Sequence, residues 1–215
     1  WAATMLSHFL GGSGQPLLIL LSSKDPFVNN PGITRATREF GTPASSDEAD
    51  FIVPLLHDFL GNYVKPAATS TGGNFSVGPI WLYGAAHYIN DPSKVFGLEP
   101  RARNDRGYWA AFGHVTIDGK FSAKGHFSCR LNGYLINYTA DYSISDRYEW
   151  FLGKETPFPF GIGGSDVKIP HEWEISLRDA GRAAEFDFTI SWKENGRLFT
   201  TPGFAQYTQA YWWAW

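Results

Sequence analysis

The chain of 215 residues carries 18 basic and 21 acidic side chains, so its formal net charge of −3 leaves no positive excess to hold a nucleic-acid backbone. A composition of 43% hydrophobic and 17% aromatic residues excludes an intrinsically disordered chain. Apolar runs such as Leu17 to Leu21 are far too short for a membrane-spanning helix, and the single Cys129 excludes an internal disulfide. We therefore expect one soluble domain over residues 1–215, with no nucleic-acid partner.

The N-terminal segment predicts a short helix followed by a strand. Apolar residues within 1–10 recur at helical spacing, and the glycine pair that follows can supply a left-handed cap. Residues 17–23 begin with an unbroken apolar run, which favours a buried strand.

The next segment predicts one more helix and then irregular structure. Residues 45–62 combine serines that can cap a helix with acidic residues in its first turn, and we expect a kink or early break near Pro54. Glycine, proline, asparagine and threonine interrupt residues 65–106, which we expect to form an irregular insertion.

The second half of the chain is dominated by alternating patterns. Residues 108–144 predict a β-meander of at least three antiparallel strands, broken by Asp118-Gly119 and Asn132-Gly133, because such dipeptides tolerate the positive φ angles of tight hairpins. A helix is expected over 170–181, with a proline in its first turn and a glycine at its end.

Residues 184–192 alternate without error and predict a further strand, which "KENGRLF" is expected to turn into a last hairpin. Together these elements predict an α+β fold dominated by antiparallel strands. The meander would form an open, barrel-like or strongly bent sheet, with three or so short helices packed on it.

The segment "SDRYEWFLG", residues 145–153, gathers two carboxylates, a guanidinium and a phenol. In an ideal strand Asp146 and Tyr148 share a face and Glu149 points away, so the two carboxylates cooperate only if the chain kinks between them. Two close carboxylates can bind Mg²⁺, or one of them can stay protonated as a general acid. The alternative is a solvated strand end in which Arg147 pairs with Asp146 or Glu149.

Four pieces of the sequence carry a family resemblance when they are taken in order: "LSHFLGGSGQP", "FGHVTIDGKFSAKGHFSCRLNGYLINY", "DRYEW" and "LRDAGRAAEFDFTI". They resemble the catalytic domain of colicin M and related lipid II-degrading bacteriocins, and also C-terminal domains of bacterial polymorphic toxins. The resemblance leaves residues 24–106 uncovered.

The resemblance implies a magnesium-dependent phosphodiesterase that cuts lipid II between the undecaprenyl chain and the pyrophosphate, in the periplasm. By position, the family's Asp-x-Tyr-Asp motif falls on Asp146, Tyr148 and Glu149. The family then continues Asn-Ala-Ser-x-His-Arg, whereas this chain reads Phe151 to Thr156 without the histidine or the arginine. His171 or Arg178, on the following helix, would have to replace them.

We therefore expect an exported antibacterial toxin domain that hydrolyses a phosphoester of a lipid-linked cell-wall precursor. Its expected catalytic residues are Asp146, Arg147, Tyr148, Glu149 and His171, with Asp146 and Glu149 also holding Mg²⁺. The sequence begins at Trp1, without an initiator methionine or leader. We accordingly expect it to be cut from a longer polypeptide that is delivered to the periplasm of a target bacterium and neutralised by an immunity protein.

The C-terminal aromatic residues keep a second hypothesis open. Tyr211, Trp212, Trp213 and Trp215 are of the types that favour membrane interfaces. They would let the enzyme touch a membrane surface. Alternatively, the chain would be a non-enzymatic membrane-perturbing toxin or a binding domain that uses its aromatic surface. A purely structural module is the third alternative.

Overall fold

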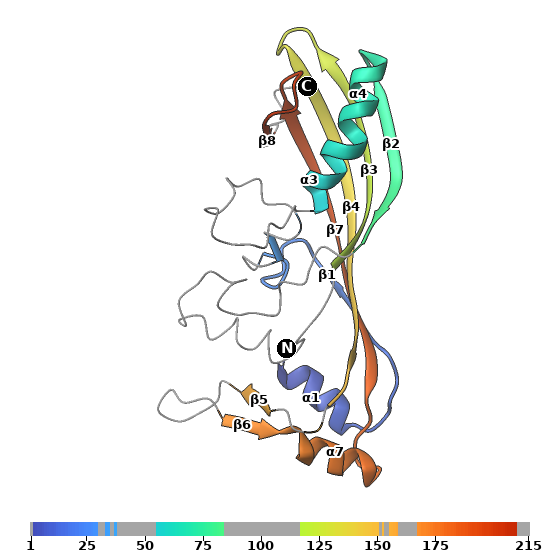
Figure 1. Ribbon diagram of the computed structural model, residues 1–215, viewed down its shortest axis with the longest axis vertical. Coiled ribbons are helices and arrows are strands. Elements are labelled where there is room, and N and C mark those ends of the chain that lie inside the picture. Colours follow the sequence, from blue (N-terminus) through green and yellow to red (C-terminus); the bar gives the residue numbers. More distant parts are fainter. Residues whose placement is uncertain are drawn as a thin grey trace. The chain divides into compact units, whose positions relative to one another are not determined.

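Figure 1 shows the computed structural model, which describes residues 2–29, 33–34, 37, 55–83, 117–150, 152, 155–158 and 167–209. The described elements form an α+β fold built on a mostly antiparallel sheet, as predicted. The sheet stays open and does not close into a barrel.

The main sheet has six strands in the order β1-β7-β4-β3-β2, with β8 pairing β7. Its strands are β1 (Leu17–Leu21), β2 (Phe75–Leu82), β3 (Ile117–Ser128), β4 (Gly133–Tyr148), β7 (Phe186–Thr200) and β8 (Tyr207–Gln209). A second, two-stranded sheet pairs β5 (Glu155–Phe158) with β6 (Val167–Pro170).

The helical segments are α1 (Ala2–Leu10), the run α3 (Leu55–Phe59), η1 (Leu60–Val64) and α4 (Lys65–Thr71), and α7 (His171–Asp179). Helix α1 buries Met5 and Phe9, which lie one turn apart, and Gly12 follows with φ +66°, the left-handed cap that the sequence predicts. Helix α7 starts after Pro170 and is followed by Gly181 with φ +66°, also as predicted. None of the described helices has the length and apolar content that crossing a bilayer requires.

The second predicted helix is displaced toward the C-terminus. It runs to Thr71 instead of ending near residue 62, and residues 45–54, with the kink expected at Pro54, lie outside the described residues. Pro66 does not end it, because this proline falls in the first turn of α4, directly after the five-residue π-helical segment η1. Gly72, with φ +62°, ends the helix.

The expectation of irregular structure over 65–106 is wrong for its described part, because residues 65–71 form α4 and residues 75–82 form β2. Residues 84–106 lie outside the described residues. A central strand would normally exclude Pro79, but β2 is the last strand in the sheet order. Its pairing with β3 also shifts register between Val77 and Ile80, so the ladder does not need the missing N–H of this proline.

Two of the glycine dipeptides do not form turns. Asn132 has φ +47° and ends the β3–β4 turn as predicted, but Gly119 lies inside β3 and Gly196 inside β7, so the last predicted hairpin is a continuous strand. An added Cβ at Gly119 would meet the ring of Phe121, and one at Gly196 would meet the ring of Tyr138. At these positions glycine makes room for an aromatic ring and does not supply a positive φ angle.

The chain, expected as one domain, divides into two compact units. Unit 1 comprises residues 1–20, 86–116 and 144–190, and unit 2 comprises residues 21–85, 117–143 and 191–215. Strands β4 and β7 contribute residues to both units.

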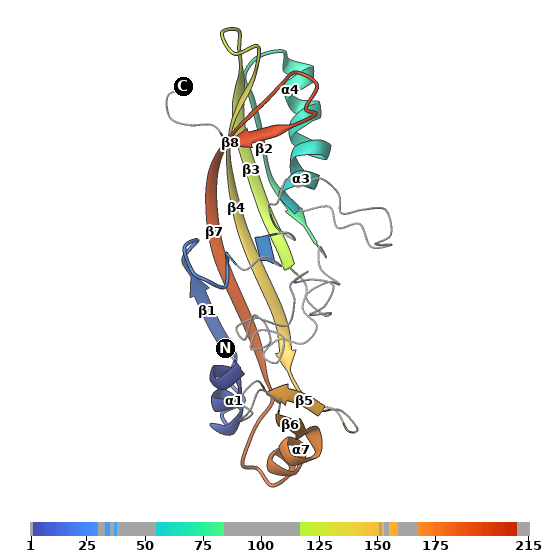
Figure 2. The same cartoon turned by 90° about the vertical axis from the view of Figure 1, so that its left-hand side faces the viewer.

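Unit 2 has an aromatic core beneath the α3–α4 run, which Figures 1 and 2 show lying along β2 and β3 on one face of the sheet. Phe121 stacks on Phe59 with ring centroids 5.2 Å apart and meets Tyr142 edge-on at 5.5 Å. All three side chains are at most 1% exposed. Burial of each ring stabilises the fold by about 1.5–3 kcal/mol, so this cluster is a main source of stability for unit 2.

Candidate functional site

The C-terminal end of β4 presents a buried face and an exposed face within unit 1. Tyr148 and Trp150 are 7% and 6% exposed, whereas Arg147 and Glu149 are exposed. Strand alternation therefore continues past Tyr148, and it places Asp146 on the face of Tyr148 and Glu149 on the opposite face.

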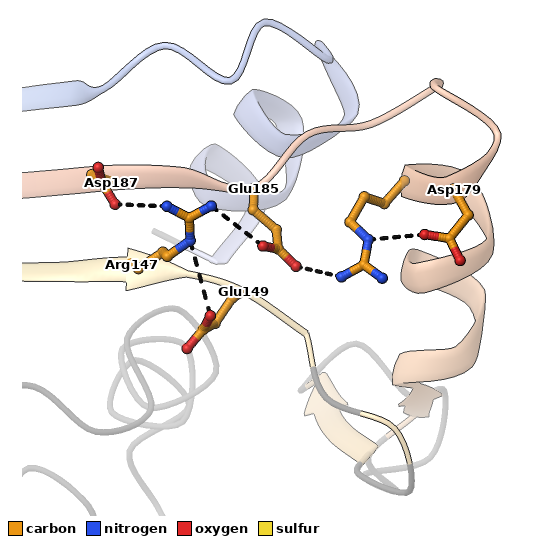
Figure 3. Close-up of polar contacts among 6 residues, drawn as sticks. Arg147, Glu149, Asp179, Glu185 and Asp187 are labelled. Atoms are coloured by element: carbon orange, nitrogen blue, oxygen red, sulfur yellow. Dashed lines mark hydrogen bonds and ion pairs between the residues drawn. The ribbon is translucent and has the colours of Figure 1, made fainter.

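The exposed face carries the network of charges drawn in Figure 3. The guanidinium of Arg147 lies 3.4 Å from Asp187 Oδ1, 3.5 Å from Glu185 Oε2 and 3.9 Å from Glu149 Oε2. Glu185 also accepts a 2.7 Å hydrogen bond from Arg178 Nη1. This is the ion-paired strand end that the sequence left open as the alternative for Arg147.

Arg178 is paired with acidic side chains and is not a free cation for the carboxylate segment. Its guanidinium donates to Glu185 and, at 3.1 Å, to Asp179, and these hydrogen bonds raise its pKa above the ordinary value. Figure 3 shows both arginines held by carboxylates, which outnumber them. A phosphate would have to displace these carboxylates, so this face is poorly suited to bind one.

The two expected metal ligands do not form a pair. Asp146 Oδ1 accepts a 2.8 Å hydrogen bond from the backbone N–H of Arg147, and Glu149, on the other face, pairs with the side chain of Arg147. Within the described ranges, no group of three or more His, Cys, Asp or Glu side chains could hold a metal ion. The described residues thus do not fit the magnesium site that the resemblance implies.

The buried face is a packed aromatic cluster. The ring of Tyr148 stacks on Phe186 with centroids 5.2 Å apart and meets Trp150 edge-on at 5.4 Å. Phe9, from α1, lies 6.1 Å from Tyr148 and 5.9 Å from Trp150. The apolar residues of α1, β4 and β7 thereby hold the phenol and the indole in fixed positions.

His171 joins this cluster from α7. Its ring is 7% exposed and lies edge-on against Trp150, with centroids 4.5 Å apart. The structure therefore brings His171 close to the segment that carries Asp146 and Tyr148. His8 has a structural position instead: its Nε2 lies 2.9 Å from Gln15 O and its ring packs against Phe186.

Glu174, which the sequence did not single out, lies one helical turn after His171 and is only 4% exposed. Burial raises its pKa above the ordinary value. The pKa of Tyr148 is raised by burial and, to a lesser extent, by the charge of Glu174. The sequence signal that could have found Glu174 is its spacing of three residues from His171, which places both on one face of the helix. The apolar residue Trp173 suggests a different buried face, but its side chain is 69% exposed.

Three buried polar atoms of this cluster have no hydrogen-bond partner among the described residues: Tyr148 Oη, Trp150 Nε1 and Glu174 Oε2. Each such group costs about 1–3 kcal/mol of folding free energy if it stays unpaired. Stable cores seldom keep several of them, so this cluster is the candidate site among the described residues.

No protein-family model, curated protein or solved structure matches the chain.

Proposed function

We propose that the chain is an exported antibacterial toxin domain that hydrolyses a phosphoester of a lipid-linked cell-envelope precursor. The observation that carries the proposal is the meeting of His171 with the Asp146–Trp150 segment, through the 4.5 Å ring contact to Trp150. A titratable ring thereby lies beside the carboxylate segment, whose continuation lacks the histidine of the family motif.

In this proposal water attacks phosphorus and the bond from phosphorus to the lipid oxygen breaks. His171 takes the proton of the attacking water, Tyr148 orients the substrate through its ester oxygen, and Asp146, half-exposed on the face of Tyr148, positions the water. Arg147 and Glu149 shape the opposite face and have no chemical step, because they pair with each other and Arg147 also pairs with Glu185 and Asp187.

Magnesium would neutralise phosphate charge in such a reaction. The described residues do not form its site, so no step is assigned to it, and Mg²⁺ dependence is tested separately by comparing turnover with and without a chelator.

The test is incubation of the purified domain with lipid II and measurement of released pyrophosphorylated disaccharide-peptide. Asp146→Asn and His171→Gln should each lower the release by about 10²–10⁴-fold, the usual contribution of a positioned acid–base group. Asp187→Asn is the matched control, since this carboxylate lies on the exposed face. Equal activity of Asp146→Asn and Asp187→Asn, or no release by an active toxin, would rule the proposal out.

The proposed setting is the periplasm of a target bacterium, with an immunity protein that blocks the site in the producing cell. Contact with the membrane surface would come from the C-terminal aromatics, and residues 210–215 lie outside the described residues.

A second candidate, a domain that binds and perturbs membranes, is favoured by an exposed aromatic pair in unit 2. Trp81 and Tyr83 are 51% and 72% exposed and stack with centroids 6.2 Å apart, and Lys120 Nζ lies 5.4 Å from the centre of the Trp81 ring. Tryptophan and tyrosine beside lysine are the residues that anchor proteins at lipid headgroups. Under this alternative, dye-loaded vesicles leak, Asp146→Asn leaves the leakage intact, and a Trp81→Ala/Tyr83→Ala double variant abolishes it.

A further inference from the structure

Glu174 is a buried carboxyl group, and within the described part of the chain no ion pair balances its charge. The described arginine on the same helix, Arg178, is bound to Glu185 and Asp179. Among the described residues, Glu174 interacts electrostatically with Tyr148 on β4, His171 is buried one turn earlier on the same helix, and Asp146 shares the face of Tyr148. A carboxyl group in such a place is most stable in its neutral form, which carries a proton and can donate it.

The polar atoms around it form a charge-free donor set. With Glu174 neutral, its carboxyl, the Tyr148 hydroxyl and the Trp150 N–H can all donate, and none of them has a partner among the described residues. They belong to one packed cluster, because the Tyr148 and Trp150 rings are 5.4 Å apart and Trp150 touches His171, one turn from Glu174. Neutral donors suit an ester or alcohol oxygen better than a multiply charged phosphate, which requires cations.

We propose that Glu174 is the general acid of the reaction, and that Tyr148 and Trp150 bind the same lipid oxygen to which Glu174 passes its proton. This inference rests on the proposed function. As the bond from phosphorus to the lipid oxygen breaks, its electron pair stays on that oxygen, which takes the proton of Glu174 and leaves as a neutral alcohol. The hydroxyl of water stays on phosphorus, the proton of that water is on His171, and its return to the Glu174 carboxylate restores both groups.

The proposal explains why two titratable groups lie one turn apart on α7. Burial favours the neutral, proton-donating form of the carboxyl group, and in the proposal the imidazole one turn earlier is the base. It also names the leaving group: a lipid alcohol, whose anion is too basic to depart without a proton.

The test compares two substrates with different leaving groups. Glu174→Gln should lower kcat on the lipid-linked precursor by about 10²–10⁴-fold. It should lower kcat by less than about tenfold on an aryl phosphodiester, because a nitrophenolate leaves without protonation. Glu172→Gln, an exposed glutamate on the same helix, is the control and should leave both rates unchanged.

The outcomes separate this inference from the function on which it rests. If the wild-type domain cleaves the lipid precursor and Glu174→Gln cleaves it as fast, or loses both substrates equally, Glu174 is not the acid. If the wild-type domain cleaves neither substrate, the proposed function falls and this assignment falls with it.

A second measurement needs no substrate. Because the pKa of Glu174 is raised in the folded state, its stability contribution is complete below the ordinary value of 4.5 and is lost as the pH rises through the folded pKa. The free energy of unfolding of wild type should therefore fall over that window relative to Glu174→Gln, and Glu172→Gln should follow wild type. Parallel pH profiles of wild type and Glu174→Gln would overturn the assignment.

Discussion

The tyrosines of β4 differ between the two units in how their hydroxyl groups are satisfied. In unit 2, Tyr134 donates to Ala68 O at 3.3 Å, Tyr138 to Glu194 Oε1 at 2.7 Å and Tyr142 to Thr37 O at 3.3 Å. In unit 1, the equally buried hydroxyl of Tyr148 has no partner within the described part of the chain.

This difference in hydrogen bonding distinguishes a unit whose buried β4 tyrosines are paired from a unit that keeps several buried polar groups unpaired. In unit 2 the β4 tyrosines donate hydrogen bonds, and among the described residues of this unit the unpaired buried side-chain atom is the indole nitrogen of Trp192. Unit 1 leaves a phenol, an indole and a carboxyl unpaired in one cluster. Sites that bind or react commonly carry such a local cost while the remainder of the fold supplies the stability.

The largest expected effect comes from breaking the scaffold of unit 2. Phe121→Ala removes a ring that is 0% exposed and packed against Phe59 and Tyr142, and it should lower the free energy of unfolding by about 3–5 kcal/mol in urea denaturation. Phe127→Ala, at a half-buried site of the same strand, should cost clearly less. Equal losses would show that the stacked rings are not the centre of the core.

A matched pair of tyrosine variants sharpens the comparison itself. Tyr142→Phe leaves the Thr37 carbonyl without its donor and should cost about 1 kcal/mol. Tyr148→Phe removes an unpaired hydroxyl and should leave stability unchanged or raise it, while it lowers turnover of the lipid precursor. A clear loss of stability in Tyr148→Phe would mean that its hydroxyl has a structural partner.

The smallest effect is expected on the exposed face of β4. Asp187→Asn removes one ion pair of Arg147 between side chains that are 67% and 51% exposed, so it should change stability by less than about 1 kcal/mol. The melting temperatures of wild type and Asp187→Asn in low salt and in molar salt test this prediction. Their small difference in low salt should disappear in molar salt, because salt screens the ion pair. A larger, salt-resistant loss would show that the network of Figure 3 holds β4 to β7.

Much of the fold could be predicted from local pattern. The helices at residues 2–10 and 171–179 and the alternation of Phe186, Phe188 and Ile190 follow the local pattern of the sequence. The apolar run at 17–21 forms the predicted strand, but its predicted burial is wrong, because Leu18 and Leu20 are 70% and 77% exposed. The glycine dipeptides could not be assigned in the same way. Whether Gly119 and Gly196 make a turn or sit beneath a ring depends on where Phe121 and Tyr138 lie.

In the candidate site, too, some features follow from local sequence and others depend on the tertiary structure. The sequence by itself drew attention to Asp146, Arg147, Tyr148 and Glu149, because these polar side chains gather at the end of an alternating strand. His171 was named only as a replacement for the histidine that the family resemblance implies. Only the tertiary structure decided that the chain keeps strand alternation and does not kink between Asp146 and Glu149. It also brought Glu185 to Arg147 and Arg178, and it buried Glu174 while leaving Trp173 exposed. The physical reason is that the ionic state and partners of a side chain depend on burial and on neighbours brought together by folding, which no local pattern encodes.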